Sequence, residues 1–242
     1  MICHSTARLE DTVMWHLQER PPSPRRPRVL GIGGYPYMGK SRLAHRIQAA
    51  WPHGRAATLA TESVILPRAA RLEREIDGCS PAGHDMHRLL EHVTALCAGR
   101  STLCREYSWS SGDAPRMTIV TGLRQGDLLI IDGSVAAAPS IASLCDLLIV
   151  LSPLEEERWL PLACERDTVE RGWDAGEART QNVRKANTSA RLGISRGIPP
   201  FLSIGVDPVS WAWSLPDQST GPGGCPVASS AMSSVTCLCN CW

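Results

Sequence analysis

Short apolar runs follow one another along the middle of the chain, separated by segments with helical periodicity. The clearest runs are LLII at 128–131 and LLIVL at 147–151, which are apolar at every position. Uninterrupted runs of this length predict strands that are buried on both faces, as in a parallel sheet covered by helices. Further strands are expected at 29–32, 55–63, 116–122 and 201–206.

Amphipathic segments lie between these runs. Leu43 and Ile47 recur at helical spacing after the first strand, and a longer helical pattern runs from Asp85 to Gly99. Residues 154–192 are charged and helix-prone. Strands that alternate with helices predict an α/β fold with a doubly wound, mostly parallel sheet and helices on both faces. Such a fold binds its ligand at the carboxyl ends of the strands.

The composition changes near both ends of the chain. Residues 1–27 end in PPSPRRP, which forbids regular structure, so we interpret them as a leader and a proline-rich linker. Residues 207–242 are rich in Ser, Pro, Gly and Cys, and they contain no Lys or Arg. We expect this tail to be disordered, and its deletion to leave stability nearly unchanged. The remaining residues, 28–206, form the predicted domain.

The first apolar run ends in a glycine-punctuated loop, GGYPYMGKS. Gly34, Gly39, Lys40 and Ser41 satisfy the pattern G-x-x-x-x-G-K-[ST], in which backbone amides cradle phosphates, Lys reaches the outer phosphates and the hydroxyl ligates Mg²⁺. A glycine-rich turn from strand to helix is the alternative, but it leaves the Lys-Ser pair unexplained. The residues expected to bind the nucleotide are Gly34, Tyr35, Pro36, Tyr37, Met38, Gly39, Lys40, Ser41 and Arg42.

Two acidic residues stand at the ends of predicted strands. Asp132 closes the LLII run, where a carboxylate holds Mg²⁺ beside the hydroxyl of Ser41. The alternative for Asp132 is an ordinary Asp-Gly turn. Glu62 ends the second strand and would accept the proton of an attacking hydroxyl. The alternative for Glu62 is a solvated carboxylate at a strand end.

The order of these motifs resembles the uridine kinase and phosphoribulokinase family of P-loop kinases. The resemblance covers about residues 28–190 and rests on GGYPYMGKS, HDMHRLLEHVTALCAGR, LLIIDGS and ERDTVERG. It implies a fold of the P-loop NTPase type, ATP and Mg²⁺ as cofactors, and phosphoryl transfer to a small-molecule acceptor.

The resemblance also implies roles for four further residues. Asp85 before the leucine-rich helix and Tyr107 in CREYSWSSG would bind the acceptor. Arg166 and Arg171 match the family's R-D-x-x-x-R-G lid and would clamp the transferring phosphoryl group, completing a catalytic set with Lys40 and Glu62. The alternatives are a helix N-cap for the Asp, an exposed aromatic for the Tyr and a solvated charged helix for the arginines.

The sequence departs from the family pattern at several positions. Glu62 stands in place of the family's Asp, and Leu162 and Ala163 stand where arginines are expected just before the lid. Tyr35 and Tyr37 are bulkier than the small residues common inside this loop. Nucleotide binding survives these changes better than specificity for uridine does.

Charge and cysteine usage narrow the class of protein. The net charge is +1, and the apolar runs are too short to span a bilayer, so neither nucleic acid nor a membrane is an expected partner. The first residues, MICHSTARLEDTV, lack the pattern of a secretory signal, which favours a cytoplasmic protein. Four of the ten cysteines lie within 225–241, where they form either a soft-metal site or an oxidation-prone tail.

These observations predict an ATP-dependent kinase that acts on a hydroxyl of a nucleoside-like or sugar-like metabolite, in the manner of uridine kinases. A rival interpretation is a nucleotide-binding regulatory protein whose acceptor site has decayed. A nucleic-acid-dependent ATPase is disfavoured, because no basic stripe with interleaved aromatics is present in the sequence. The identity of the acceptor and the oligomeric state do not follow from the sequence.

Overall fold

One sheet forms the centre of the molecule, and its strand order places the glycine-punctuated loop in the middle. The computed structural model describes residues 8–19, 25–193 and 201–215. Within them, a six-stranded sheet has the order β2-β5-β1-β6-β7-β8, parallel throughout except for the last pair. Its strands are β1 (Arg28–Gly34), β2 (Ala56–Ala60), β5 (Leu128–Asp132), β6 (Leu147–Pro153), β7 (Phe201–Val206) and β8 (Trp213–Ser214). The predicted mostly parallel sheet is confirmed.

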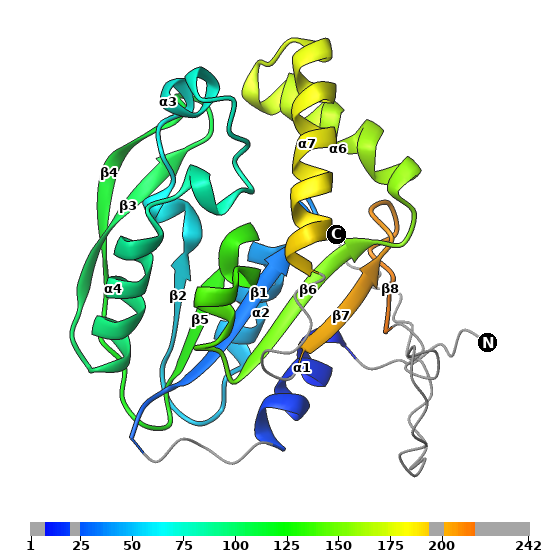
Figure 1. Ribbon diagram of the computed structural model, residues 1–242. Helices are drawn as coiled ribbons and strands as arrows, with labels where there is room; N and C mark the ends of the chain where they lie inside the picture. The colour runs from blue at the N-terminus through cyan, green and yellow to red at the C-terminus, as the bar shows by residue number, and fades with distance from the viewer. Residues whose placement is uncertain (1–7, 20–24, 194–200, 216–242) are drawn as a thin grey trace.

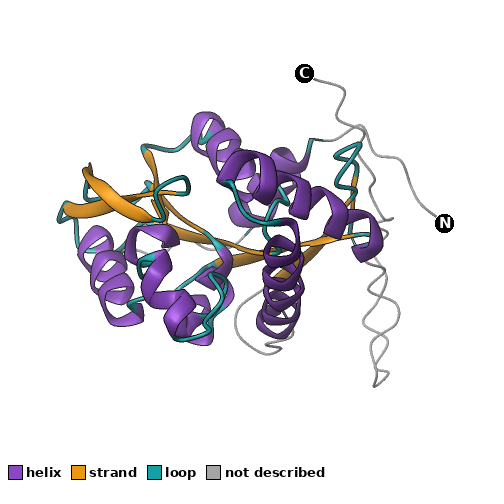
Figure 2. Cartoon of the chain, turned by 90° about the horizontal axis from the view of Figure 1, so that it is seen from above, coloured by secondary structure: helices purple, strands orange, loops and turns teal. Residues whose placement is uncertain are grey.

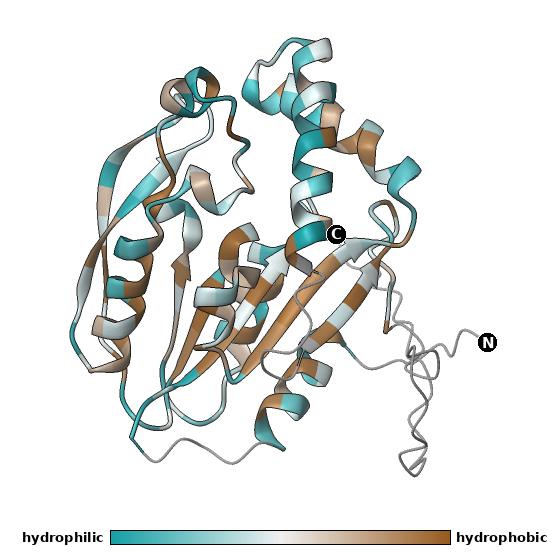
Figure 3. Ribbon diagram, in the orientation of Figure 1, coloured by the Kyte–Doolittle hydropathy of each residue, from teal (hydrophilic) through white to brown (hydrophobic). Residues whose placement is uncertain are grey.

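Alternation along the central strands explains why both faces of the sheet are covered. In β5, Leu128 and Ile130 pack into one apolar cluster, whereas Leu129 and Ile131 pack into another on the opposite face. Figure 3 shows the resulting apolar colour along β1, β5 and β6. Seen from above, helices lie on both sides of the sheet (Figure 2). The uninterrupted apolar runs are therefore the direct consequence of two-sided burial.

The helices divide between these two faces and the upper edge of the sheet (Figure 1). Helices α1 and α2 join one cluster with β1, and α4 joins the other with β5. The helices are α1 (Leu9–Gln18), α2 (Lys40–Ala50), α3 (Arg68–Glu73), α4 (Met86–Cys97), α5 (Pro139–Ala142), α6 (Glu156–Arg171) and α7 (Ala175–Gly193). Short 3-10 turns are η1 (Thr61–Val64), η2 (Pro81–Gly83) and η3 (Ser134–Ala137). Within the described residues, no helix is both long and apolar enough to cross a bilayer.

A separate antiparallel hairpin follows α4. It consists of β3 (Thr102–Ser108) and β4 (Asp113–Val120), and Figure 1 shows it at the left of the molecule. The sequence predicts only a strand at 116–122, so β3 is missed and the boundaries of β4 are displaced. The physical reason is exposure, because nearly every residue of β4 faces solvent and the pair therefore lacks a clean apolar alternation.

Both ends of the domain extend further than the sequence predicts. Val13 and Leu17 of α1 are fully buried in the core, so this part of the expected leader belongs to the domain. Trp213 in β8 is 1% exposed, so residues beyond the predicted domain end at 206 also pack against the sheet. Residues 216–242, with the four clustered cysteines, lie outside the described residues.

Replacing Trp213 tests whether the residues after β7 pack as part of the domain. Trp213→Ala should lower the free energy of unfolding by about 3–5 kcal/mol, because it leaves a large cavity in the core. Urea denaturation followed by circular dichroism measures the change. As a control on the same segment, Val209→Ala should change stability by no more than about 0.5 kcal/mol, since Val209 is 59% exposed. Equal stability of the two variants would show that the strand after β7 does not pack.

Candidate functional site

The loop between β1 and α2 has the backbone geometry of an anion cradle. Gly34 has φ 110°, and a side chain there would strike the carbonyl of Leu151 in the neighbouring strand. Gly39 has φ 73° and stands directly before α2, whose first residue is Lys40. A helix that begins at such a loop presents unpaired N–H groups and the positive end of its dipole to a bound anion. This geometry agrees with the predicted phosphate loop.

Lys40 is held over this loop. Its Nζ donates to the carbonyl oxygens of Tyr35 at 2.6 Å and of Gly34 at 3.3 Å. Burial lowers the pKa of Lys40 below its ordinary value, and the carboxylates of Asp132 and Glu62 oppose that shift. The ammonium group is thus poised at the loop among groups of opposite charge.

Two carboxylates come together at the carboxyl edge of the sheet. Asp132 at the end of β5 is 5% exposed and accepts a hydrogen bond from Ser41, while its Oδ1 has no partner among the described residues. Burial raises the pKa of Asp132 above its ordinary value. Burial and then the negative charge of Asp132 raise the pKa of Glu62, in η1, to about 7. A buried carboxylate beside a half-buried one favours a shared proton or a bound cation.

A pocket of about 330 Å³ opens over the loop and gathers most of the predicted site. The predicted residues that line it are Pro36, Tyr37, Met38, Gly39, Lys40, Ser41, Arg42, Glu62, Arg166 and Arg171. They come from the loop, from η1 and from α6, which are far apart in the sequence. The fold therefore brings together the phosphate loop, the candidate base and both candidate lid arginines.

The predicted lid is the C-terminal half of α6, and it is tied to α7 by a buried ion-pair network. Asp167, 2% exposed, accepts from Arg171 Nη1 at 2.7 Å and from Lys185 Nζ at 2.8 Å. Arg166 pairs instead with Glu170, at 2.8 Å. Arg171 also stacks on Trp109, with 4.0 Å from its guanidinium carbon to the ring centroid. These contacts fix the lid arginines at the pocket wall.

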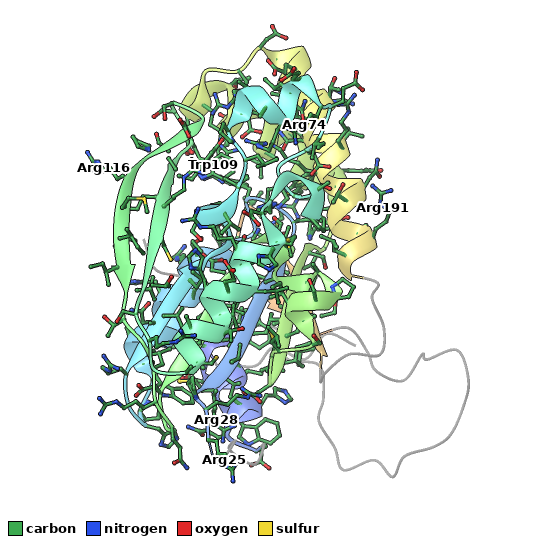
Figure 4. All side chains as sticks on the ribbon, turned by 60° about the vertical axis from the view of Figure 1, so that its left-hand side comes forward. Arg25, Arg28, Arg74, Trp109, Arg116 and Arg191 are labelled. Carbon is green, nitrogen blue, oxygen red and sulfur yellow. The ribbon has the colours of Figure 1, made fainter. Side chains whose placement is uncertain are left out.

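Aromatic rings surround the loop and the lid. Trp109, in the turn of the β3–β4 hairpin, lies near α3 (Figure 4), and its carbonyl accepts from Arg68. Trp211 lies against Gly39, where an added Cβ would stand 2.9 Å from the indole ring. Its ring meets that of Tyr37 edge-on, with 6.2 Å between the ring centroids. The guanidinium carbon of Arg166 lies 5.2 Å from the centroid of the Tyr37 ring. The segment after β7 thus contributes to the wall of the pocket.

The two residues that were predicted to bind the acceptor, Asp85 and Tyr107, lie in different places. Asp85 caps α4, accepting from the backbone N–H of Arg88 at 3.0 Å, and it lies at a separate depression beside that helix. Tyr107 lies in β3, and its hydroxyl accepts from Arg71 Nη2 at 2.8 Å. Arg71 itself lines the pocket, so Tyr107 reaches the site through that arginine. The acceptor roles of both residues stay predictions.

Sequence reasoning missed several residues that line the pocket. Arg71 in α3, Lys185 in α7 and Trp211 after β7 all face it, together with Trp109 and Trp173. Two signals were available, namely an Arg among apolar neighbours at 64–72 and a Lys in a helix otherwise rich in Arg. Neither signal is specific, because only the tertiary fold shows that these cations turn inward.

Comparison with protein-family models matches residues 29–190 to the phosphoribulokinase / uridine kinase family. The chain belongs to this family. The match runs from β1 into the last turn of α7, so it includes the predicted phosphate loop, both carboxylates and the predicted lid. This family consists of kinases that transfer phosphate to hydroxyl groups of small molecules. ATP use is typical of the family.

Individual relatives differ in the acceptor that their names state. A pantothenate kinase of Sorangium cellulosum (strain So ce56) is 31% identical over 156 residues, which cover 57% of this chain and 50% of that relative. The chain thus spans about half the length of this curated relative. The fold is similar to that of D-glycerate 3-kinase from Cryptococcus neoformans, with a TM-score of 0.61, 13% identity, and 83% and 94% of the two chains covered. It is also similar to phosphoribulokinase from Rhodobacter spheroides, with a TM-score of 0.57, 15% identity, and 80% and 82% covered.

Replacing Lys40 tests the phosphate loop. Lys40→Ala should weaken ATP binding by about 10- to 100-fold, because it removes a charged donor from the phosphates. The fold should be retained, since the Nζ contacts involve only two loop carbonyls. Titration with a fluorescent ATP analogue measures the affinity, and circular dichroism controls for folding. Unchanged affinity for ATP in a folded variant would show that the loop is not part of the nucleotide site.

Proposed function

We propose that this protein transfers the γ-phosphate of ATP to a hydroxyl group of a small metabolite, with Mg²⁺ as the metal cofactor. The observation that carries the proposal is the single pocket in which Lys40, Glu62 and the lid arginines meet above the loop. Phosphoryl transfer needs little covalent chemistry from the protein, and it depends on positioning and on stabilising charge. This pocket supplies both.

The residues beside Lys40 fit a divalent cation. Asp132 Oδ1 is buried without a hydrogen-bond partner among the described residues, and Ser41 lies next to the same carboxylate. Hard oxygen ligands of this kind suit Mg²⁺, which would offset the charge of the phosphates when bound. Ser41 and Asp132 are therefore the proposed metal-binding residues.

Each remaining group has a role in the transfer. The acceptor oxygen bonds to the γ-phosphorus while the bond to the bridging oxygen of ADP breaks, and the proton of the acceptor passes to Glu62. Lys40 and the loop amides hold the phosphates, and Arg166 and Arg171 stabilise the charge that develops on the transferred group. A carboxylate whose pKa is about 7 is well matched to accepting a proton near neutrality.

Acceptor-dependent formation of ADP tests the proposal. Purified protein with ATP and Mg²⁺ should form ADP slowly alone and much faster with the correct acceptor, drawn from a panel of nucleosides, sugars and hydroxy acids. Uridine belongs in the panel because of the resemblance in sequence, and pantothenate and D-glycerate because of the names of relatives. Tight ATP binding with no acceptor-dependent turnover would favour the rival regulatory function.

One observation supports that rival. Tyr37 and Trp211 crowd the loop, and the left-handed φ values of both, 64° and 59°, are strained for residues with a side chain. A loop that relaxes when nucleotide binds would suit a switch. The proposal of a kinase is preferred because Glu62 and the lid arginines line the same pocket, and a switch needs neither.

The pH dependence of turnover tests the role of Glu62. The carboxylate must be unprotonated to accept the proton, so turnover should fall about tenfold per pH unit below the pKa of about 7 and level off above it. Glu62→Gln should lower turnover by about 10²-fold or more and remove this pH dependence, while ATP affinity changes by less than about twofold. If Glu62→Gln kept the pH profile of the original protein, Glu62 would not be the base.

The metal site is tested by a change at the neighbouring acid. Asp132→Asn should weaken nucleotide binding in the presence of Mg²⁺ and have little effect in its absence, because it removes charge from the metal ligands. Isothermal titration calorimetry with ATP, performed once in the presence of Mg²⁺ and once in the presence of EDTA, separates the two conditions. An equal loss of affinity under both conditions would assign Asp132 a purely structural role.

A further inference from the structure

One end of the pocket is unusually rich in positive charge. The described residues that line the whole pocket include six cationic side chains, Lys40, Arg42, Arg71, Arg166, Arg171 and Lys185, and two carboxylates, Glu62 and Glu170. We call the group formed by Arg71, Arg171 and Lys185, with Trp109 and Trp173, the cationic end. Its three charges come from α3, α6 and α7.

The buried ion pairs at this end do not balance. Arg171 and Lys185 share the single carboxylate of Asp167, and their side chains are only 7% and 6% exposed. Asn182 donates a hydrogen bond to Asp167 and accepts one from Lys185, but it adds no charge. Glu170, the other nearby acid on α6, is paired with Arg166. The buried Asp77 accepts from Thr188 and from the backbone N–H of Cys79, and among the described residues it forms no salt bridge with Arg71 or Lys185. A cation without a direct counter-charge is costly to bury, so a bound anion would stabilise this end.

Hydrogen-bond donors at the cationic end also lack partners. Arg171 Nε and Trp173 Nε1 are buried, and neither has an acceptor among the described residues. Both atoms can only donate. A buried donor without an acceptor costs free energy, and an oxyanion would satisfy such donors and the excess charge together.

Arg71 is held rigidly at the same place. Its Nε donates to the carbonyl of Leu66 at 3.0 Å and its Nη2 to the hydroxyl of Tyr107 at 2.8 Å. The remaining Nη1 lies beside Gly78, where a Cβ would stand 2.9 Å away, and both residues line the pocket. A guanidinium fixed in this way loses little conformational freedom when it binds an anion.

The cationic end is distinct from the phosphate loop. Glu62 interacts electrostatically with Lys40 on one side and with Arg171 on the other, so the candidate base stands between the loop and the cationic end. Lys40, the loop amides and the proposed Mg²⁺ already serve the triphosphate of ATP. Of the charges beyond Glu62, those of Arg71 and Lys185 are therefore available to the second substrate.

We propose that the acceptor carries a carboxylate or a phosphate in addition to the hydroxyl that is phosphorylated, and that Arg71 and Lys185 hold this anion, while Arg171 serves the phosphoryl group that is transferred. The proposal rests on the proposed kinase function and narrows its acceptor class. Hydroxy acids and sugar phosphates are the compounds that fit, whereas a neutral nucleoside leaves the cationic end without a counter-charge.

Matched acceptor pairs test the proposal directly. The pairs are D-glycerate and glycerol, pantothenate and pantothenol, and ribulose 5-phosphate and ribulose, which differ mainly in the anionic group. In each pair that supports turnover, kcat/KM for the anionic member should exceed that for the neutral one by about 10²-fold, and the third pair distinguishes phosphate from carboxylate. Uridine should be a poor acceptor. Turnover of any neutral compound as fast as its anionic partner would overturn the proposal.

Two variants on one helix locate the anion. Lys185→Met should raise KM for the anionic acceptor by about 10- to 100-fold and leave KM for ATP within about twofold. Arg184→Met removes the same charge from the adjacent, exposed position outside the pocket and should change neither constant. A parallel rise of both KM values in Lys185→Met would assign the cationic end to the triphosphate and contradict the proposal.

A binding measurement covers the case in which no compound is turned over. Isothermal titration of the full chain, saturated with a non-hydrolysable ATP analogue and Mg²⁺, should show binding of D-glycerate, pantothenate or inorganic phosphate that is lost in Lys185→Met. Absence of any such binding overturns the anionic acceptor even if ATP binds. Failure of the ATP analogue to bind would instead overturn the proposed function.

Discussion

Opposite charges gathered at the carboxyl edge of the parallel sheet constrain the rest of the molecule. Asp132 and Glu62 are placed side by side by β5 and η1, and Lys40 is drawn toward them from the start of α2. Asp132 is buried and the other two groups are half-buried, so the three charges stabilise this edge by offsetting one another. The parallel register of β2, β5 and β1 is what brings them to the same edge, so strand order and site chemistry are inseparable here.

The lid depends on a second buried charge arrangement. Asp167 joins α6 to α7 by accepting from Arg171 and Lys185, and these two cations also lie over the rings of Trp109 and Trp173. This arrangement holds the lid arginines at the pocket wall, and it leaves an excess of positive charge where the second substrate would lie. The proposed phosphate binding at one end and the proposed anion binding at the other thus rest on the same principle, the offsetting of buried charge.

The sequence predicted features that depend on neighbours in the chain. The apolar runs of β5 and β6, the loop before Lys40 and Asp132 at the end of β5 could all be found, because burial and a glycine-punctuated loop leave local patterns. Glu62 was expected to end a strand over 55–63, but β2 ends at Ala60 and Glu62 lies in the following turn η1. The hairpin strand β3 was missed, since a half-exposed pair lacks apolar alternation. Lys185 and Trp213 were missed because only tertiary packing shows that they turn inward. The polar composition after residue 206 likewise gave no sign that the indole of Trp213 is buried.

The central claim is that phosphate moves from ATP to an acceptor in this pocket, and phosphorus NMR follows that movement directly. Protein, ATP and Mg²⁺ are incubated with each acceptor in turn, and the spectra are recorded over time. The account predicts that the γ-phosphate signal of ATP declines while a phosphomonoester signal of the acceptor grows by the same amount. Loss of ATP to inorganic phosphate alone, or no change with any acceptor, would contradict it.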